Sequence, residues 1–476
     1  MESNLTRIFN VSNEEESWLG YSCASIGDVN GDSFMDVIVA AYGSSYSEDG
    51  VAHVVYGTNT SAAYLASYLD LGAGDDGGLD GVDGFTLTGI QVVADIYANE
   101  LPVTFDRQLS SQYTGNPVSS AGDANGDGYD DVLVGSPAAG TVSQGHAYLV
   151  FGGPDLPANM NLESNMTGQN GITFKGALTD EAGFSVSGGF DMNGDELSDF
   201  IIGAPEGGTL GEFDGEAYVI FGQVTFGESS TILLDTDLDG TNGFSIVGPS
   251  ENAYAGSAVS GAGDVNCDGY DDVVVGAFGA EPDGRYRAGA AYVLFGRAEG
   301  TFEASYDLKS ADVVDGTNAA SLLGLRAQNA LGIGVGSAGD MNGDGISDLW
   351  VGAPTADQDE LDSAGTVYVV YGWQEDEEGY PWGNSVDLSA LDGSAGYAVN
   401  GSTANGHFGW SGANVDLNHD GLSDLIVGAF VVPGLYVVYG DAGEADDNST
   451  AIIAATVCGV LGCIFFCFYE ARVWVS

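Results

Sequence analysis

The chain has 476 residues, of which 70 are acidic and only 9 are lysine or arginine, so that its formal charge is −61. This charge excludes the classes of protein that bind nucleic acids or membrane surfaces through basic patches. A hydrophobic fraction of 44% excludes wholesale disorder. The 75 glycines, together with so few basic residues, favour short strands and many turns over long helices.

The N-terminus has no signal-peptide pattern. Residues 1–7, MESNLTR, lack a basic segment followed by an apolar one. The first strand that we predict is LTRIFNV, residues 5–11.

Six internal repeats follow, each recognised by an acidic segment that runs into an apolar one. The spacing between their leading aspartates is 95, 68, 73, 76 and 76 residues, and an insertion near residues 91–117 accounts for the long first interval. The six segments are residues 27–43, 122–137, 190–205, 263–278, 339–354 and 415–430.

Each repeat predicts four short strands. A strand of small residues precedes the acidic segment, as in SAVSGAG at 257–263, and a Val/Ile-rich strand follows it. The third strand ends in an aromatic residue and a glycine, and the fourth begins with glycine, as in GFSIVG at 243–248. Four antiparallel strands repeated around an axis form a β-propeller.

The predicted fold is therefore all-β, a six-bladed or incomplete seven-bladed propeller over residues 1–440. The sixth repeat ends with its third strand, GLYVVYG at 434–440. We expect the strand at 5–11 to pair beside it and close the ring like a clasp.

The acidic segments have the form D-x-N-x-D-x-φ-x-D, where φ is apolar. Side chains at positions 1, 3, 5 and 9 and the backbone carbonyl at position 7 supply oxygen ligands only. Calcium prefers such a set, whereas zinc prefers His or Cys and magnesium fewer carboxylates. The predicted Ca²⁺ ligands are Asp28, Asn30, Asp32, Phe34 and Asp36; Asp123, Asn125, Asp127, Tyr129 and Asp131; Asp191, Asn193, Asp195, Leu197 and Asp199; Asp264, Asn266, Asp268, Tyr270 and Asp272; Asp340, Asn342, Asp344, Ile346 and Asp348; and Asp416, Asn418, Asp420, Leu422 and Asp424.

Positions 4 and 6 of these loops are mostly glycine, which predicts positive φ angles there. The exceptions are Cys267 and His419 at position 4, and Ser33 and Glu196 at position 6, where we expect weaker binding. The alternative is a hairpin rich in Asx turns that holds no metal. Six such loops would each contain mutually repelling carboxylates if empty, which favours calcium.

An uncharged apolar run follows an acidic linker at 441–450. Residues 451–469, AIIAATVCGVLGCIFFCFY, would form about 28 Å of helix, close to the thickness of a bilayer core. We predict a single transmembrane helix with the tail 470–476 inside, because Arg472 follows it. A buried core segment and a lipid-anchor signal are the alternatives.

The cysteines and histidines show no pattern typical of a disulfide framework, a metal site or a catalytic site. Five cysteines without CxxC spacing predict no disulfide framework, and we expect the isolated Cys23 and Cys267 to be buried. The four histidines form no metal or acid–base cluster, so no enzyme activity is predicted. Glycosylation sequons, compatible with export, occur at Asn4, Asn10, Asn59, Asn165, Asn400 and Asn448.

The third strand of each repeat ends in an aromatic residue and a glycine, and Gly-Ala-Pro occurs at 203–205 and 352–354. Together these motifs resemble the FG-GAP repeat. With its acidic loops, the chain resembles the N-terminal propeller of integrin alpha subunits over residues 1–440. The resemblance implies an extracellular adhesion module, with calcium on one face and ligand on the opposite face. Integrin propellers have seven blades, a stalk and a juxtamembrane Gly-Phe-Phe-Lys-Arg, all absent here, which makes a beta-subunit partner doubtful.

These inferences predict a calcium-binding, membrane-anchored glycoprotein at the cell surface that binds an extracellular protein or glycan. The alternatives are a calcium-stabilised propeller enzyme acting on polysaccharide or lipid, and a structural surface-coat protein.

Overall fold

The computed structural model describes most of the repeat region. The described residues are 18–42, 50–57, 84–90, 118–208, 213–226, 229–358, 361–374, 382–430, 434–441 and 452–455. The predicted strand at 5–11, the insertion at 91–117 and the apolar residues 456–469 lie outside these ranges.

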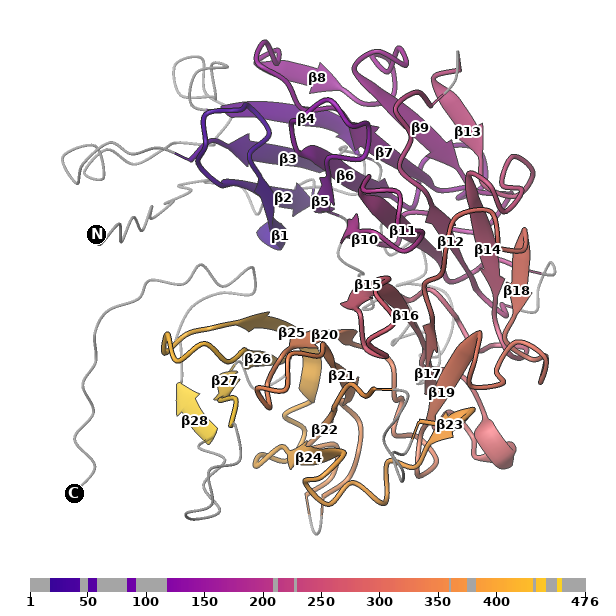
Figure 1. Ribbon diagram of the computed structural model, residues 1–476, viewed down its shortest axis with the longest axis vertical. Helices are drawn as coiled ribbons and strands as arrows, with labels where there is room; N and C mark the ends of the chain where they lie inside the picture. The colour runs from indigo at the N-terminus through magenta and orange to yellow at the C-terminus, as the bar shows by residue number, and fades with distance from the viewer. Residues whose placement is uncertain are drawn as a thin grey trace, which may run out of the picture.

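Six antiparallel sheets stand side by side around a common centre (Figure 1). The innermost strand of each sheet is rich in small residues, because these strands crowd together at the centre. These inner strands pack in chain order, and they are β1 (Trp18–Gly27), β5 (Val118–Gly122), β10 (Ser185–Phe190), β15 (Ala258–Gly263), β20 (Val335–Gly339) and β25 (Phe408–Val415).

The second and third strands of each sheet form its centre. Four of the second strands are buried at every residue, as expected for continuous apolar runs that are covered on both faces. The second strands are β2 (Asp36–Tyr42), β6 (Asp131–Ser136), β11 (Asp199–Ala204), β16 (Asp272–Ala277), β21 (Asp348–Ala353) and β26 (Asp424–Ala429). The third strands are β3 (Gly50–Val55), β7 (His146–Val150), β12 (Glu216–Ile220), β17 (Ala290–Leu294), β22 (Thr366–Val370) and β27 (Gly434–Val438).

The outer strands link neighbouring repeats. The fourth strands are β4 (Gly84–Ile90), β9 (Gly171–Lys175), β14 (Gly243–Val247), β19 (Ala319–Leu323), β24 (Gly396–Asn400) and β28 (Ile452–Ala455). Four sheets gain a fifth strand, which comes from the following repeat and pairs in parallel with the fourth strand. These additional strands are β8 (Asn159–Asn161), β13 (Thr231–Leu233), β18 (Ser305–Asp307) and β23 (Ser385–Val386).

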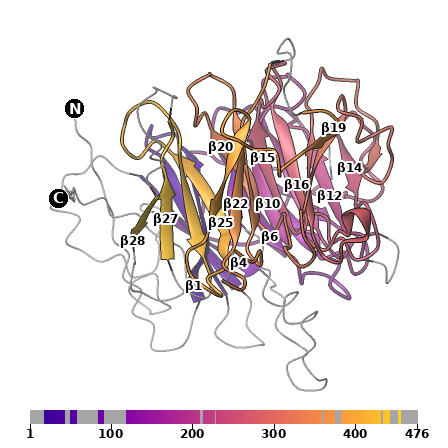
Figure 2. The same cartoon turned by 90° about the horizontal axis from the view of Figure 1, so that it is seen from below.

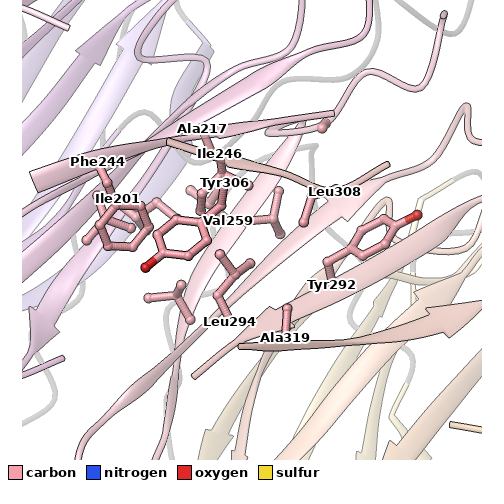
Figure 3. Packing of buried hydrophobic residues seen from close by; sticks show 14 of the residues in the cluster. Ile201, Ala217, Phe244, Ile246, Val259, Tyr292, Leu294, Tyr306, Leu308 and Ala319 are labelled. Atoms are coloured by element: carbon pink, nitrogen blue, oxygen red, sulfur yellow. The ribbon is translucent and has the colours of Figure 1, made fainter. Parts of the chain in front are cut away.

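The hydrophobic core lies between the sheets. One cluster fills each interface between neighbours, and the interface between the third and fourth sheets is drawn in Figure 3. There Phe244 of β14 is fully buried, and its ring lies 5.2 Å from Phe302 and 5.0 Å from Tyr306. Because the clusters lie between successive sheets, each sheet depends on a neighbour to bury its apolar side chains.

The C-terminal sheet differs from the prediction in two ways. β28 pairs antiparallel with β27, in the position that we predicted for residues 5–11, so the clasp prediction is wrong. Residues 452–455 of the predicted membrane helix are thus an edge strand, which suits the β-branched Ile452 and Ile453. Within the described ranges, none of the segments forms a helix of the length and hydropathy needed to cross a bilayer.

The two isolated cysteines also differ from expectation. Cys23 and Cys267 are exposed, and Cys267 is a free thiol. Cys267 occupies position 4 of an acidic loop, where the side chain projects toward solvent.

Candidate metal centre

All six acidic loops occupy the same place in the fold, the turn between the first and second strands of each sheet. Figure 2 shows the strands running along one common direction, so the turns between them gather at two ends of the molecule. The six loops therefore lie at one end.

The aspartate at position 9 is the first residue of the second strand and is fully buried in every repeat. In the third repeat, Asp199 Oδ1 accepts the N–H of Gly222 at 2.8 Å, and its Oδ2 accepts the N–H of Met192 at 2.8 Å. One carboxylate thus joins the loop to the glycine that ends the third strand. The same pair of bonds recurs, at 2.7–3.1 Å, for Asp36, Asp131, Asp272, Asp348 and Asp424.

The side chains at positions 1, 3 and 5 fold back onto the loop. In the third repeat, Asp191 Oδ2 accepts the N–H of Glu196 at 3.0 Å, and Asp195 Oδ1 accepts the N–H of Leu197 at 2.9 Å. The Oδ1 of Asn193 accepts the N–H of Asp195 at 2.9 Å. All six loops repeat these bonds, so all are wound in the same way.

The predicted positive φ angles are present at positions 4 and 6, including the residues that are not glycine. Cys267 has φ 58° and His419 has φ 60° at position 4, and Ser33 has φ 71° and Glu196 has φ 70° at position 6. The loop conformation is therefore imposed by its hydrogen bonds rather than by glycine alone, at some cost in backbone strain.

The repeat glycines are required by close contacts. A Cβ on Gly222, which follows the third strand, would lie 2.7 Å from the carbonyl oxygen of Ser198 at position 8. A Cβ on Gly203, at the end of β11, would lie 2.0 Å from the carbonyl oxygen of Gly256 in the next repeat. One glycine makes room for the acidic loop, and the other makes room for the neighbouring sheet.

Burial raises the pKa of most position 9 carboxyl groups. The pKa is about 6 for Asp36, about 7 for Asp348 and about 8 for Asp131, and it is well above the usual range for Asp199 and Asp272. The two amide donors to each group act in the opposite direction, whereas the aspartates at positions 5 and 1 raise the pKa further.

The donor set fits a hard cation. Each loop places three carboxylates and an amide oxygen in nine residues, with a carboxylate buried beside two like charges. Within the parts of the chain that the structure describes, no three His, Cys, Asp or Glu side chains already converge as metal ligands do. The loop oxygens instead accept amides of their own backbone, and the Asn193 Nδ2 donates to Asp195. The pattern is thus compatible with Ca²⁺.

Sequence reasoning missed two features of this centre: the hydrogen bonds of position 9 to the glycine of the third strand, and the bonds that join one loop to the next. The first has a sequence signal, because the aspartate and the glycine recur together. The second is formed largely by backbone atoms, which no residue pattern reveals.

The position 9 aspartate is expected to stabilise the fold even without metal. In chelator, Asp199→Ala should lower the free energy of unfolding by about 2 kcal/mol or more, because two buried amides lose their acceptor. Denaturant unfolding measures this, with Asp155→Ala, an exposed acid, as the control expected to lie within about 0.5 kcal/mol of the parent. Equal stability of Asp199→Ala and the parent would contradict this role.

The FG-GAP repeat matches five segments, residues 20–65, 116–150, 255–294, 334–370 and 408–443. The third repeat lies outside these segments, yet the structure gives it the same strands and the same loop.

Named relatives fall into two groups. The mouse phosphatidylinositol-glycan-specific phospholipase D is 30% identical over 36% of this chain and 18% of its own length. The Xenopus laevis integrin alpha-5 is 29% identical over 52% of this chain and 20% of its own length. The Caenorhabditis briggsae integrin alpha pat-2 is 30% identical over 50% of this chain and 17% of its own length. The matches thus cover at most a fifth of each of these relatives. The chain is an FG-GAP repeat protein, related through its repeats to integrin alpha chains and to phosphatidylinositol-glycan-specific phospholipases D.

Proposed function

We propose that this protein is a calcium-stabilised β-propeller that acts as an extracellular adhesion or ligand-binding module. The observation that carries the proposal is the repetition of one oxygen-rich loop six times at one end of the fold. Relatedness to integrin alpha chains supports the adhesion role.

Calcium is the cation that the loops favour. The charges that surround each buried position 9 carboxylate are mainly the aspartates of its own loop, so a divalent cation would offset their repulsion. When bound, the ion would supply charge neutralisation and a fixed loop conformation, and Asp and Asn side chains at positions 1, 3, 5 and 9 would hold it.

The opposite end of the inner strands carries a second feature, an aromatic cluster close to the centre. We name Phe184, Tyr254, Phe278 and Trp410 the central aromatic cluster. Tyr254 stacks on Phe278 at 5.2 Å, and Trp410 stacks on Phe430 at 4.7 Å. Tyr254 and Trp410 remain partly exposed, as binding residues must be. We propose this end as the ligand-binding face for a protein or glycan.

An enzyme that acts on lipid or polysaccharide is the second candidate. The relatedness to phosphatidylinositol-glycan-specific phospholipases D favours it, because the mouse enzyme is 30% identical over its matched region and integrin alpha-5 is 29% identical over its own. A surface-coat protein, the third reading, would assemble regularly without a ligand.

Membrane anchoring competes with strand β28 for the same residues. If 452–455 remain in the sheet, the apolar residues that follow, 456–469, would span only about 21 Å as a helix, less than the bilayer core. We propose that the chain is anchored through 451–469 and that β28 leaves the sheet when the helix inserts.

Calcium is expected to raise the melting temperature of the whole chain. Each site contributes about 2.7 kcal/mol when free calcium is a hundred times its dissociation constant. A thermal melt in millimolar calcium against chelator measures the shift, with magnesium as the ion control. Asp127→Asn should reduce the shift, and an unchanged melting temperature in calcium would reject the calcium site.

Ligand binding is expected to depend on the central aromatic cluster. A screen of immobilised extracellular proteins and glycans should yield saturable binding, which Trp410→Ala weakens about tenfold or more, since such anchors dominate interfaces. Val224→Ala is the control, because Val224 is 75% exposed near the acidic loops. Binding lost equally in both variants would argue against this face, and turnover of a glycosylphosphatidylinositol or an acidic polysaccharide would favour the enzyme.

Membrane attachment is tested by flotation with phospholipid vesicles. The full chain should float with the vesicles, whereas Leu461→Asp should remain at the bottom, because a charge at the centre of a membrane helix is unfavourable. Val224→Asp, an equal change on the exposed surface, should float like the parent. A parent chain that stays at the bottom would contradict anchoring.

A further inference from the structure

Neighbouring acidic loops are joined to each other by backbone hydrogen bonds. The residue at position 8 of each loop donates its N–H to the carbonyl oxygen of position 1 in the loop before it. The bond is present at all five joints between successive loops: Asp130 to Asp28 at 3.2 Å, Ser198 to Asp123 at 3.2 Å, Asp271 to Asp191 at 3.0 Å, Ser347 to Asp264 at 3.2 Å and Ser423 to Asp340 at 2.9 Å.

A second bond accompanies the first at every one of these joints. The residue after the glycine that follows the third strand donates its N–H to the carbonyl oxygen of position 2 in the preceding loop. The bonded pairs are Gly153 and Val29 at 2.8 Å, Gln223 and Ala124 at 2.9 Å, Arg297 and Met192 at 2.9 Å, Trp373 and Val265 at 2.8 Å, and Asp441 and Met341 at 2.8 Å.

Side chains strengthen these joints. Asp130 Oδ2 accepts the N–H of Asp28 at 2.7 Å, and Asp271 Oδ2 does the same for Asp191 at 2.9 Å. At the first three joints the position 7 side chain also lies against position 4 of the preceding loop, since a Cβ on Gly31 would lie 2.4 Å from the ring of Tyr129. The loops therefore touch through both backbone and side chains.

Each joint depends on a residue that the calcium ion would fix. Asp123 would hold the ion with its side chain, and the carbonyl oxygen of the same residue accepts the N–H of Ser198 in the next loop. Ordering one loop thus places the acceptors that its neighbour needs. The neighbour then loses less conformational freedom when it binds its own ion, which gives positive cooperativity.

We propose that the six loops bind calcium as a linked row, in which an ion in one loop raises the affinity of the adjacent loops and tightens the joint between their sheets. This inference rests on the calcium binding proposed above. Coupling between binding sites is reciprocal, so each loop strengthens the loops on both sides.

Hydrogen exchange of the full chain during a calcium titration tests the proposal, with Asp127→Ala removing a ligand from the second loop. We expect the calcium midpoints of the first and third loops to rise about fivefold or more, a typical coupling between sites. At saturating calcium, exchange at the amides of Ser198 and Gln223 should quicken about tenfold. The amides of Ser423 and Asp441, at the far end of the row, should keep the parent rates.

Asp155→Ala is the matched control, and Asp127→Asn replaces Asp127→Ala if that variant does not fold. Changes confined to the second loop, with unaltered midpoints in the first and third loops, would overturn the linked row while leaving calcium binding intact. Absence of any calcium response in the parent would overturn calcium binding itself, and the linked row with it.

Discussion

The carboxylate at position 9 is the contact on which every sheet depends. It is a buried carboxyl group whose two oxygens accept the N–H of a loop residue and the N–H of the glycine that follows the third strand, as Asp199 does for Met192 and Gly222. Burial disfavours the charged form, and the other loop aspartates add to that effect, so the amides compensate only part of the penalty. Binding of a cation near the carboxylate, or its protonation, would remove the rest of this penalty.

Much of the fold could be predicted because the same signals recur in each repeat. The apolar runs, the glycine ends and the loop spacing each point to four strands and one turn, and Cys267 and His419 adopt the loop conformation that glycine adopts elsewhere. A single repeat would have left strand and loop assignments ambiguous. The third repeat shows the value of spacing, since its structure follows the others although Glu196 and Phe190 depart from the common pattern.

Other features could not be predicted, for physical reasons. The strands that cross to the preceding sheet are only two or three residues long, too short to show a hydrophobic period. A buried leucine, such as Leu162 or Leu308, nevertheless follows within two residues of each of the four. The apolar run that begins at Ala451 satisfies the criteria for a membrane helix and for an edge strand alike, and only the unpaired edge of β27 selects the strand. The joints between loops use main-chain atoms, which carry no residue identity.

Single inner strands connect the two ends of the molecule. The inner strands β10, β15 and β25 run between the central aromatic cluster and an acidic loop, as β10 does between Phe184 and Asp191. A six-residue strand covers about 20 Å. Because the loop of β10 is joined to the loops on both sides, an ion bound there as proposed would limit the movement of the strand at its other end. Under the proposed function, calcium would thus act on the proposed ligand face without touching it, by holding that face rigid rather than by reshaping it.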